Sequence, residues 1–250
     1  MFSIPSGSGQ DEGSTCQPGV VEAYSHRQEA WEAAHSRFET DEQEVRKFVG
    51  RLRTMGAEGW PRNSEIVELF CGRGNGLRAL NKLGFTRLEG VDLSASLLAR
   101  YRGPGKCYRC DCKQLPFHDR SKDVVIIHGG LHHLAKLPED VEQTLSEMYR
   151  ILRDGGVVGV VEPWSTPFLS FVHAMCRTNI ARRLSRKVDA LATMIHYERS
   201  TYEQWLRQPK TVLELVEKYF QPTRQSFGWG KLMFVGTKRR QNTGSTGQVF

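Results

Sequence analysis

The sequence predicts an α/β fold built on a doubly wound, mostly parallel sheet. Short apolar runs alternate with helical patterns beyond residue 64, and this alternation favours parallel strands joined by right-handed crossovers. The run Ile66-Val67 leads into a turn with glycines at 72, 74 and 76, and a second run ends at Asp92, 24 residues beyond Glu68. A strand that turns through closely spaced glycines into a helix is typical of a nucleotide-type binding loop.

The periodicity predicts seven strands. We expect them over 65–70, 86–91, 106–110, 122–128, 156–161, 222–228 and 231–237, with helices over 74–84, 94–101, 139–152 and 212–220. Gly155-Gly156 should turn the chain from helix to strand. Gly228-Trp229-Gly230 should close a C-terminal antiparallel hairpin.

One domain is predicted over residues 21–240. Segments 1–20 and 241–250 lack a periodic apolar pattern, so we expect two disordered tails. Two helices are expected over 24–52, and the second begins after Thr40, a capping residue followed by acids. Residues 165–209 are expected to form a helical insert or lid.

The insert carries an apolar stripe with basic residues on its other faces. The stripe consists of Ile180, Leu184, Val188, Leu191 and Ile195, and the basic residues are Arg182, Arg183, Arg186 and Lys187. Two interpretations stay open. The helix packs on the sheet as a lid with solvated basic side chains, or it lines a hydrophobic acceptor pocket that contacts a membrane surface or an anionic substrate.

The composition of the chain indicates the cellular compartment. The net charge of +7 permits an anionic partner without demanding one. No apolar run reaches the roughly 18 residues of a membrane span, and the first residues lack a signal-peptide pattern. Six cysteines suit a reducing compartment. We therefore expect a cytoplasmic protein.

The spacing Cys107-x-x-Cys110-x-Cys112 could hold zinc, with Cys71 or His118 as a fourth ligand. No second cysteine pair exists, however, and a strand followed by an acidic residue already explains the segment. We expect no metal site.

The glycine turn favours an adenosine cofactor that is not a dinucleotide. A dinucleotide fingerprint that starts at Gly72 needs its third glycine at position 77, which is Leu77. Glu68 would repel a pyrophosphate, but it suits a cofactor with a cationic amino-acid end, such as S-adenosylmethionine. Asp92 lies where a carboxylate accepts hydrogen bonds from a ribose diol.

Several stretches, in a common order, resemble class I S-adenosylmethionine-dependent methyltransferases. The resemblance is strongest to the broad subgroup that includes the ubiquinone and menaquinone biosynthesis methyltransferases. The matching stretches are 66–74, 88–94, 110–119, 122–128, 131–134 and 147–156. The resemblance implies a seven-stranded Rossmann-like sheet with S-adenosylmethionine as the cofactor and methyl transfer as the activity.

The resemblance also implies which residues bind the cofactor. They are Glu68, Phe70, Gly72, Gly74, Asp92, Leu93, Asp111, Cys112 and His128. The stretch 68–74 would contact the methionine part, Asp92 the ribose hydroxyls and Leu93 the adenine face. Asp111 and the N–H of Cys112 would bond the adenine edge, and His128 would line the methyl-transfer region. Taken singly, Asp92 and Asp111 also suit plain turns, and Glu68 suits a surface acid.

Two residues depart from the family's pattern. Phe70 stands where the family has a small residue, typically glycine, and its ring would crowd the methionine end of the cofactor. Arg73 replaces the usual small residue between Gly72 and Gly74. These departures are either benign variation or the mark of a degenerate site.

The acceptor side offers candidate catalytic residues. Methyl transfer is an in-line displacement, so alignment of the acceptor is the main task, and a base helps where a proton must leave. His128 and Glu162 end the fourth and fifth expected strands, where the acceptor should lie. His132 and His133 are consecutive and should point different ways on a helix, which favours a packing or capping role.

Three functions fit these observations. The first is methyl transfer to a small-molecule acceptor, with an aromatic or lipid-like acceptor favoured by the aromatic residues of the insert. The second is methylation of a nucleic acid, although His128-Gly-Gly stands where many base-amino methyltransferases have an Asn/Asp-Pro-Pro-Tyr/Phe-type motif. The third is a non-catalytic partner subunit, which Phe70 motivates. The sequence leaves the oligomeric state open.

Overall fold

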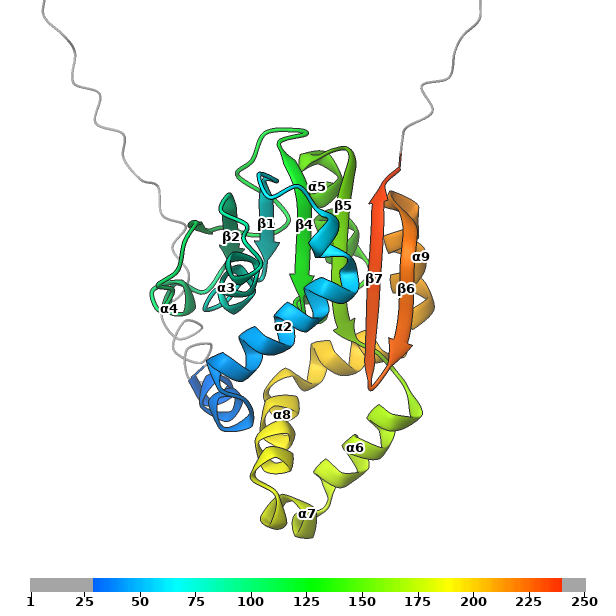
Figure 1. The fold of residues 1–250 in the computed structure, drawn as a ribbon. Coiled ribbons are helices and arrows are strands. Elements are labelled where there is room, and N and C mark those ends of the chain that lie inside the picture. Colours follow the sequence, from blue (N-terminus) through cyan, green and yellow to red (C-terminus); the bar gives the residue numbers. More distant parts are fainter. Residues whose placement is uncertain (1–28, 240–250) are drawn as a thin grey trace, which may run out of the picture.

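One seven-stranded sheet organises residues 29–239, the part of the chain that the structure, a computed structural model, describes. Its strand order is β3-β2-β1-β4-β5-β7-β6 (Figure 1). Strands β1 to β5 are parallel, and β7 runs antiparallel to both β5 and β6. The predicted fold class is confirmed. The predicted tails lie outside the described residues, and the single-domain boundaries stay a prediction.

The strands occupy nearly the predicted positions. They are β1 (Ile66–Leu69), β2 (Leu88–Asp92), β3 (Lys106–Arg109), β4 (Lys122–His128), β5 (Leu152–Pro163), β6 (Phe220–Gly228) and β7 (Lys231–Lys238). β1 is buried along its whole length, and so is most of β4, because helices cover both faces of the sheet there. Trp229 and Gly230 both have positive φ, as the two-residue type I′ turn between β6 and β7 requires.

Gly155 and Gly156 lie inside β5, so the predicted helix-to-strand turn at these glycines was wrong. Lys122 of β4 pairs with Leu152 of β5, but Val124 pairs with Val157, so β5 carries extra residues between the two pairs. These residues form a bulge in which Gly155 has a φ of 77°. A bulge and a turn look alike in sequence because both favour glycine in the left-handed region.

Helices cover the two faces of the sheet. On one face α2 (Asp41–Met55) and α3 (Asn75–Lys82) share an apolar cluster with β1 and β4. On the other face α5 (Glu139–Ile151) and α9 (Pro209–Tyr219) share a second cluster with β4, β5 and β7. The short α4 (Ala95–Leu98) precedes β3. The fold is therefore a three-layer α/β/α arrangement (Figure 1).

The predicted insert consists of three helices below the carboxyl ends of the parallel strands (Figure 1). They are α6 (Pro167–Arg177), α7 (Asn179–Leu184) and α8 (Arg186–Arg207). The buried Trp205 anchors α8, since its Nε1 donates to the carbonyl of Pro163 at 2.8 Å. No helix within residues 29–239 is both long and apolar enough to cross a bilayer.

The apolar stripe predicted for the insert is split between two helices. Ser185 caps α8 by accepting from the N–H of Val188, so α7 and α8 are separate. Ile180 and Leu184 of α7 are 74% and 83% exposed and do not pack on the sheet. The expectation of one continuous stripe was therefore wrong at its first two residues.

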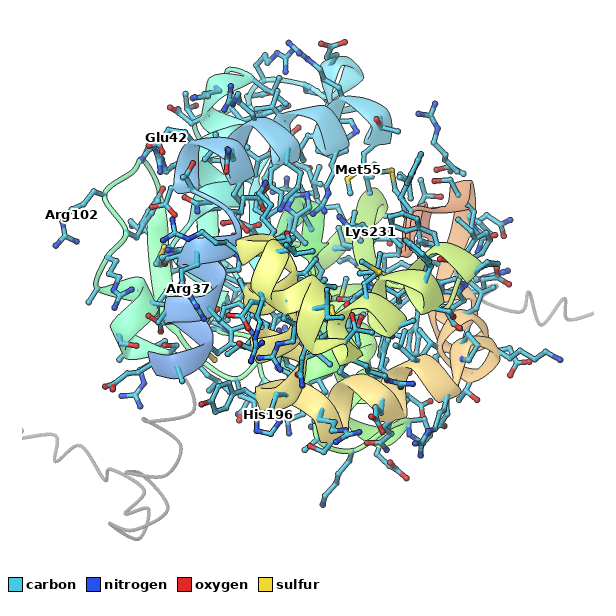
Figure 2. The ribbon with its side chains drawn as sticks, turned by 90° about the horizontal axis from the view of Figure 1, so that it is seen from below. Arg37, Glu42, Met55, Arg102, His196 and Lys231 are labelled. Carbon is cyan, nitrogen blue, oxygen red and sulfur yellow. The ribbon has the colours of Figure 1, made fainter. Side chains whose placement is uncertain are left out.

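Two N-terminal helices reach the same end of the sheet. Residues 29–38 form the first, and α2 follows after Thr40, which caps it as predicted; the side chains of Thr40 and Gln43 form a capping box. Figure 2 views the molecule from this end and shows Arg37 of the first helix beside α8. Arg37 Nη1 lies 3.3 Å from Asp189 Oδ2 of α8, which joins the N-terminal helix to the insert.

Candidate functional site

The strand order reverses between β1 and β4, at the carboxyl end of the sheet. Ligands of open α/β sheets bind at such a switch point because the loops on its two sides diverge there. β1 pairs with β2 on one side and with β4 on the other. The predicted site residues at positions 68–74, 92 and 128 therefore come from three adjacent strand ends.

Asp92 holds the glycine turn in place. Its Oδ2 accepts from the N–H of Gly72 at 2.8 Å, and its Oδ1 accepts from the N–H of Ser94 at 2.8 Å. Burial raises the pKa of Asp92, and the N–H groups of Ser94 and Gly72 oppose this effect. Each carboxylate oxygen has a further lone pair, so Asp92 can bind the turn and still accept from a ligand.

Glycine is required at position 74 of this turn. Gly74 has a φ of 74°, and the ring of Tyr101 lies so close that an added Cβ would overlap it. Gly74 also precedes the first residue of α3, whose first-turn N–H groups have no partner within the helix. The turn therefore places glycine backbone without side chains, and the N-terminus of α3, at the switch point.

Glu68 lies beneath the turn and is buried, which excludes its reading as a surface acid. Its Oε1 is 3.1 Å from His128 Nδ1. Gly76 packs so tightly against the carboxylate that an added Cβ would overlap it, which makes Gly76 a site residue that the sequence reasoning missed. Burial raises the pKa of Glu68 well above its usual range, and the neighbouring charge of Glu44 adds to the effect.

His128 is buried between Glu68 and α2. Its ring stacks on Phe48 of α2 with 4.3 Å between ring centroids. Burial, together with the charge of Arg51, lowers the pKa of His128 to about 3, so the ring is neutral. His128 Nε2 has no hydrogen-bond partner within residues 29–239. Buried polar atoms are rarely left unpaired.

Phe70 keeps the backbone conformation that suits glycine. Its φ is 56°, in the left-handed region, where a side chain costs about 1 kcal/mol. The ring lies against Gly130, after β4, where an added Cβ would overlap it. The ring therefore fills the corner between the ends of β1 and β4, where the family's glycine leaves space.

Arg73 links the glycine turn to the N-terminal helices. Its Nη2 is 3.0 Å from His35 Nδ1 and 3.2 Å from Asp41 Oδ1. Asn75 Nδ2 donates to Glu44 Oε2 at 2.8 Å. The sequence showed only an arginine in a place usual for a small residue, because its partners lie more than 30 positions earlier.

The residues predicted for adenine lie at the ends of β2 and β3. Leu93 follows β2 and is 57% exposed. Asp111 Oδ1 accepts from the N–H of Lys113 at 2.9 Å, and the buried Cys112 places its Sγ 3.4 Å from Thr144 Oγ1. Leu93 is an exposed apolar side chain beside the glycine turn, and its role and those of Asp111 and Cys112 stay predictions.

The cysteines at 107, 110 and 112 point in different directions. Cys107 lies near Cys71, and Cys110 Sγ donates to the carbonyl of Gln114 at 2.8 Å. Cys112 faces Thr144 instead. Within residues 29–239 these cysteines form no cluster that could hold a metal ion.

Glu162 organises the loop after β4. Its Oε1 accepts from the N–H groups of Gly130 and Leu131, each at 2.8 Å, and its Oε2 lies 2.7 Å from His132 Nδ1. The side chain is fully buried, so the protein itself occupies both oxygens. Glu162 thus has a positioning role, and its part in catalysis stays a prediction.

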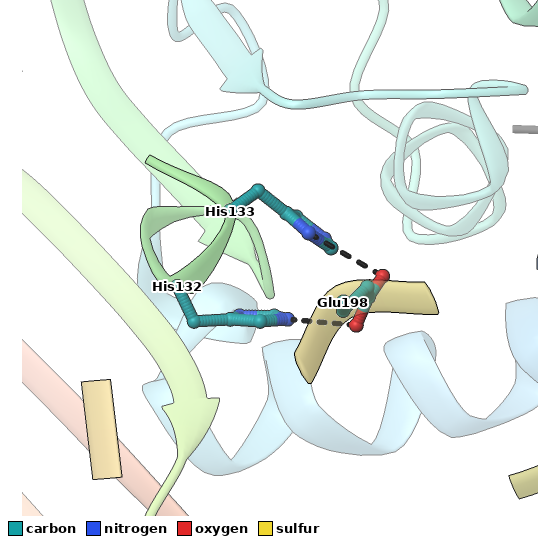
Figure 3. Close-up of side chains that lie close together, drawn as sticks. All are labelled: His132, His133 and Glu198. Carbon is teal, nitrogen blue, oxygen red and sulfur yellow. Dashed lines mark ion pairs between the residues drawn. The ribbon is translucent and has the colours of Figure 1, made fainter. Parts of the chain in front are cut away.

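His132 and His133 converge on one carboxylate of the insert. They lie in the 3-10 turn Leu131–His133, and their ring centroids are 4.1 Å apart. Figure 3 shows both rings facing Glu198 of α8. The expectation that these histidines point different ways was wrong, because both side chains turn toward α8.

Comparisons with known proteins agree with this architecture. Residues 67–160 match the model of a family described as a methyltransferase domain. These residues form a methyltransferase domain. A structure from Pyrococcus horikoshii superposes with a TM-score of 0.56 at 19% identity, covering 79% of this chain and 92% of that chain. The methyltransferase domain therefore lies within a fold that spans most of the described residues.

Two comparisons involve named methyltransferases. The demethylmenaquinone methyltransferase of Staphylococcus aureus is 32% identical over 122 residues, which are 46% of this chain and 49% of that protein. The 1,6-didemethyltoxoflavin-N1-methyltransferase of Burkholderia thailandensis, solved with 1,6-didemethyltoxoflavin and S-adenosylhomocysteine, superposes with a TM-score of 0.55 at 17% identity, covering 92% of this chain and 94% of that chain. The chain spans only about half the length of the curated relatives that it matches.

Proposed function

We propose that this protein transfers a methyl group from S-adenosylmethionine to a small-molecule acceptor. The observation that carries the proposal is the hydrogen bond from the Gly72 N–H to the Asp92 carboxylate at the switch point. This bond holds a turn whose glycines lack side chains beside a carboxylate that can still accept hydrogen bonds from a ligand. The unpaired Nε2 of His128 lies under the same turn and suits a polar ligand group. Apart from the ring of Phe70, the residues present therefore suit the cofactor.

Each residue has a role that follows from its place. Asp92 would accept from the ribose hydroxyls, and Leu93 would cover the adenine face. Asp111 and the N–H of Cys112 would bond the adenine edge. The turn from Glu68 to Gly74 would hold the methionine end, which brings a sulfonium methyl group to the site. His128 stays neutral, so it adds no positive charge that would repel the sulfonium.

The acceptor side is bounded by the insert and the loop after β4. The Staphylococcus relative is named for demethylmenaquinone, and the Burkholderia structure holds 1,6-didemethyltoxoflavin, so both names point to small molecules. Phe171, Ile180 and Leu184 are exposed on α6 and α7. Apolar side chains beside arginines suit an aromatic or lipid-like acceptor and contact with a membrane surface. We retain His128 and Glu162 as candidate acceptor-side groups.

The cofactor assignment is tested by calorimetric titration of the whole chain with S-adenosylmethionine, S-adenosylhomocysteine and NAD. We expect binding of the first two and none of NAD. Asp92→Ala should weaken binding by at least about tenfold, since it removes the ribose acceptors and releases the turn. Asp154→Ala, in the exposed bulge of β5, is the matched control. Equal affinity in Asp92→Ala and the wild type would refute the assignment.

The other two hypotheses are separated by further measurements. Phe70 is the observation that favours a non-catalytic partner subunit, and turnover by the isolated chain would exclude that role. Nucleic-acid methylation stays an alternative that is not favoured, and the cytoplasmic location stays a prediction. RNA binding that falls steeply with salt would support the nucleic-acid hypothesis.

A further inference from the structure

A second polar cluster lies at the carboxyl ends of β4 and β5. Its members are His132, His133 and Glu198 (Figure 3). Within residues 29–239, this is the one group of three or more His, Cys, Asp or Glu side chains whose metal-binding atoms all lie within 4.8 Å of one another. We propose that this cluster binds a divalent transition-metal ion through two imidazole nitrogens and one carboxylate.

The distances in the cluster suit a shared ion better than direct hydrogen bonds. Glu198 Oε2 is 3.8 Å from His132 Nε2, and Glu198 Oε1 is 3.4 Å from His133 Nδ1. Hydrogen bonds of this kind are commonly about 2.9 Å long. Two ligand atoms at about 2.1 Å from a tetrahedral ion lie about 3.4 Å apart, which is close to the observed spacing.

His132 is oriented as metal-bound histidines usually are. Its Nδ1 lies 2.7 Å from Glu162 Oε2, and an ionised carboxylate can only accept, so Nδ1 carries the hydrogen. The lone pair is then on Nε2, the atom that faces Glu198. A carboxylate that fixes the tautomer and direction of a ligating histidine is a recurrent feature of metal sites. This assigns Glu162 a supporting role behind the metal ligand.

Charge and surroundings favour a divalent ion. The carboxyl groups of Glu162 and Glu198 lie against the two imidazoles, so the cluster presents oxygen and nitrogen donors to a cation. The rings of Trp31 and Tyr202 pack edge-on against His133 and His132. Two nitrogens and one oxygen suit zinc and its first-row neighbours better than magnesium or calcium.

Three protein ligands leave a coordination position open, as in catalytic zinc sites. The His133 side chain is 38% exposed, so solvent or a ligand can reach the cluster. A donor atom of the methyl acceptor could occupy this position, and that point alone rests on the proposed function. Metal binding itself can be measured on a chain that transfers no methyl group.

The test uses the full chain, stripped with a chelator and titrated calorimetrically with Zn²⁺. We expect one high-affinity equivalent. Glu198→Gln and His133→Asn should each weaken binding by at least about tenfold. The matched controls are Glu203→Gln and His196→Asn, which lie on α8 outside the cluster and should bind as the wild type does. His133 is partly exposed, so its variant keeps the test valid even if Glu198→Gln folds poorly.

Cobalt(II) absorption then identifies the ligands. Visible bands without thiolate-to-metal charge transfer would support the histidine–carboxylate site. Three outcomes would overturn the proposal: no Zn²⁺ binding by the wild type, unchanged affinity in folded Glu198→Gln and His133→Asn, or thiolate charge-transfer bands, which would place the ion on the cysteines.

Discussion

Three carboxylates at the carboxyl end of the sheet differ in what they can do for a ligand. Asp92 accepts one backbone N–H on each oxygen and keeps lone pairs for a ligand. Glu68 is buried beneath the turn and pairs with His128. Both carboxylate oxygens of Glu162 hydrogen-bond with the loop after β4. Burial and existing bonds therefore distinguish three acids that look equivalent in sequence: Asp92 keeps acceptor capacity for the proposed ligand, Glu68 is enclosed beneath the turn, and Glu162 is committed to the loop.

Phe70 sets the residue-scale prediction. In Phe70→Gly the ring no longer crowds the methionine end, and we expect the affinity for S-adenosylhomocysteine to rise roughly tenfold, or about 1.4 kcal/mol. Phe70→Ala removes the ring but keeps a side chain at positive φ, so it should gain affinity while being about 1 kcal/mol less stable than Phe70→Gly. Calorimetry and urea unfolding measure the two effects. An unchanged or lower affinity in both variants would show that the ring does not crowd the cofactor.

At the scale of elements, the glycine turn is linked to α2 by side chains. Arg73 and Asn75 reach Asp41 and Glu44, which lie in the first turn of α2. The residues 29–38 supply His35 to the same network. The N-terminal helices are therefore fastened to the loop that is proposed to hold the cofactor.

Glu44 makes this link depend on pH. Burial alone would raise its pKa, but the hydrogen bond and charge of His35, with Asn75 and Lys47, lower it to about 2. A carboxyl whose folded pKa is lowered contributes stability above its unfolded pKa of about 4.5 and loses it as the pH falls toward 2. We expect Glu44→Gln to lower the free energy of unfolding by roughly 2 kcal/mol at pH 7. The loss should become smaller at each step from pH 5 to pH 3.

Urea unfolding of Glu44→Gln and of the wild type at pH 7, 5, 4 and 3 measures this difference. Glu42→Gln, an exposed position of the same helix, is the control and should change little. If the difference in free energy of unfolding between Glu44→Gln and the wild type stayed constant over this range, the lowered pKa assigned to Glu44 would be contradicted.

Features that depend on local spacing could be predicted from the sequence. The strand-and-glycine pattern around Gly72 and the carboxylate at Asp92 are separated by one βαβ unit, so their meeting follows from the fold. The contacts of Arg73 with α2 and of His132 with Glu198 could not be predicted. They join segments from different parts of the chain, and only the packing of the N-terminal helices and the insert brings them together.

At the scale of the whole molecule, both proposed sites lie at one end of the sheet. The N-terminal helices fasten to the glycine turn, and α8 brings Glu198 to the loop after β4. Arg37 joins the N-terminal helices to α8 (Figure 2). Cofactor binding at the turn should therefore also reduce the opening of α2 and the 29–38 helix, because they share its contacts.

The most direct measurement of the central claim is hydrogen–deuterium exchange of the whole chain with and without S-adenosylhomocysteine. We predict slower exchange in the turn 70–76, after β2 at 92–94 and after β3 at 111–113, with no change in the β6–β7 hairpin, which lies away from the switch point. Protection confined to the hairpin, or no protection at a saturating concentration of the ligand, would contradict the account.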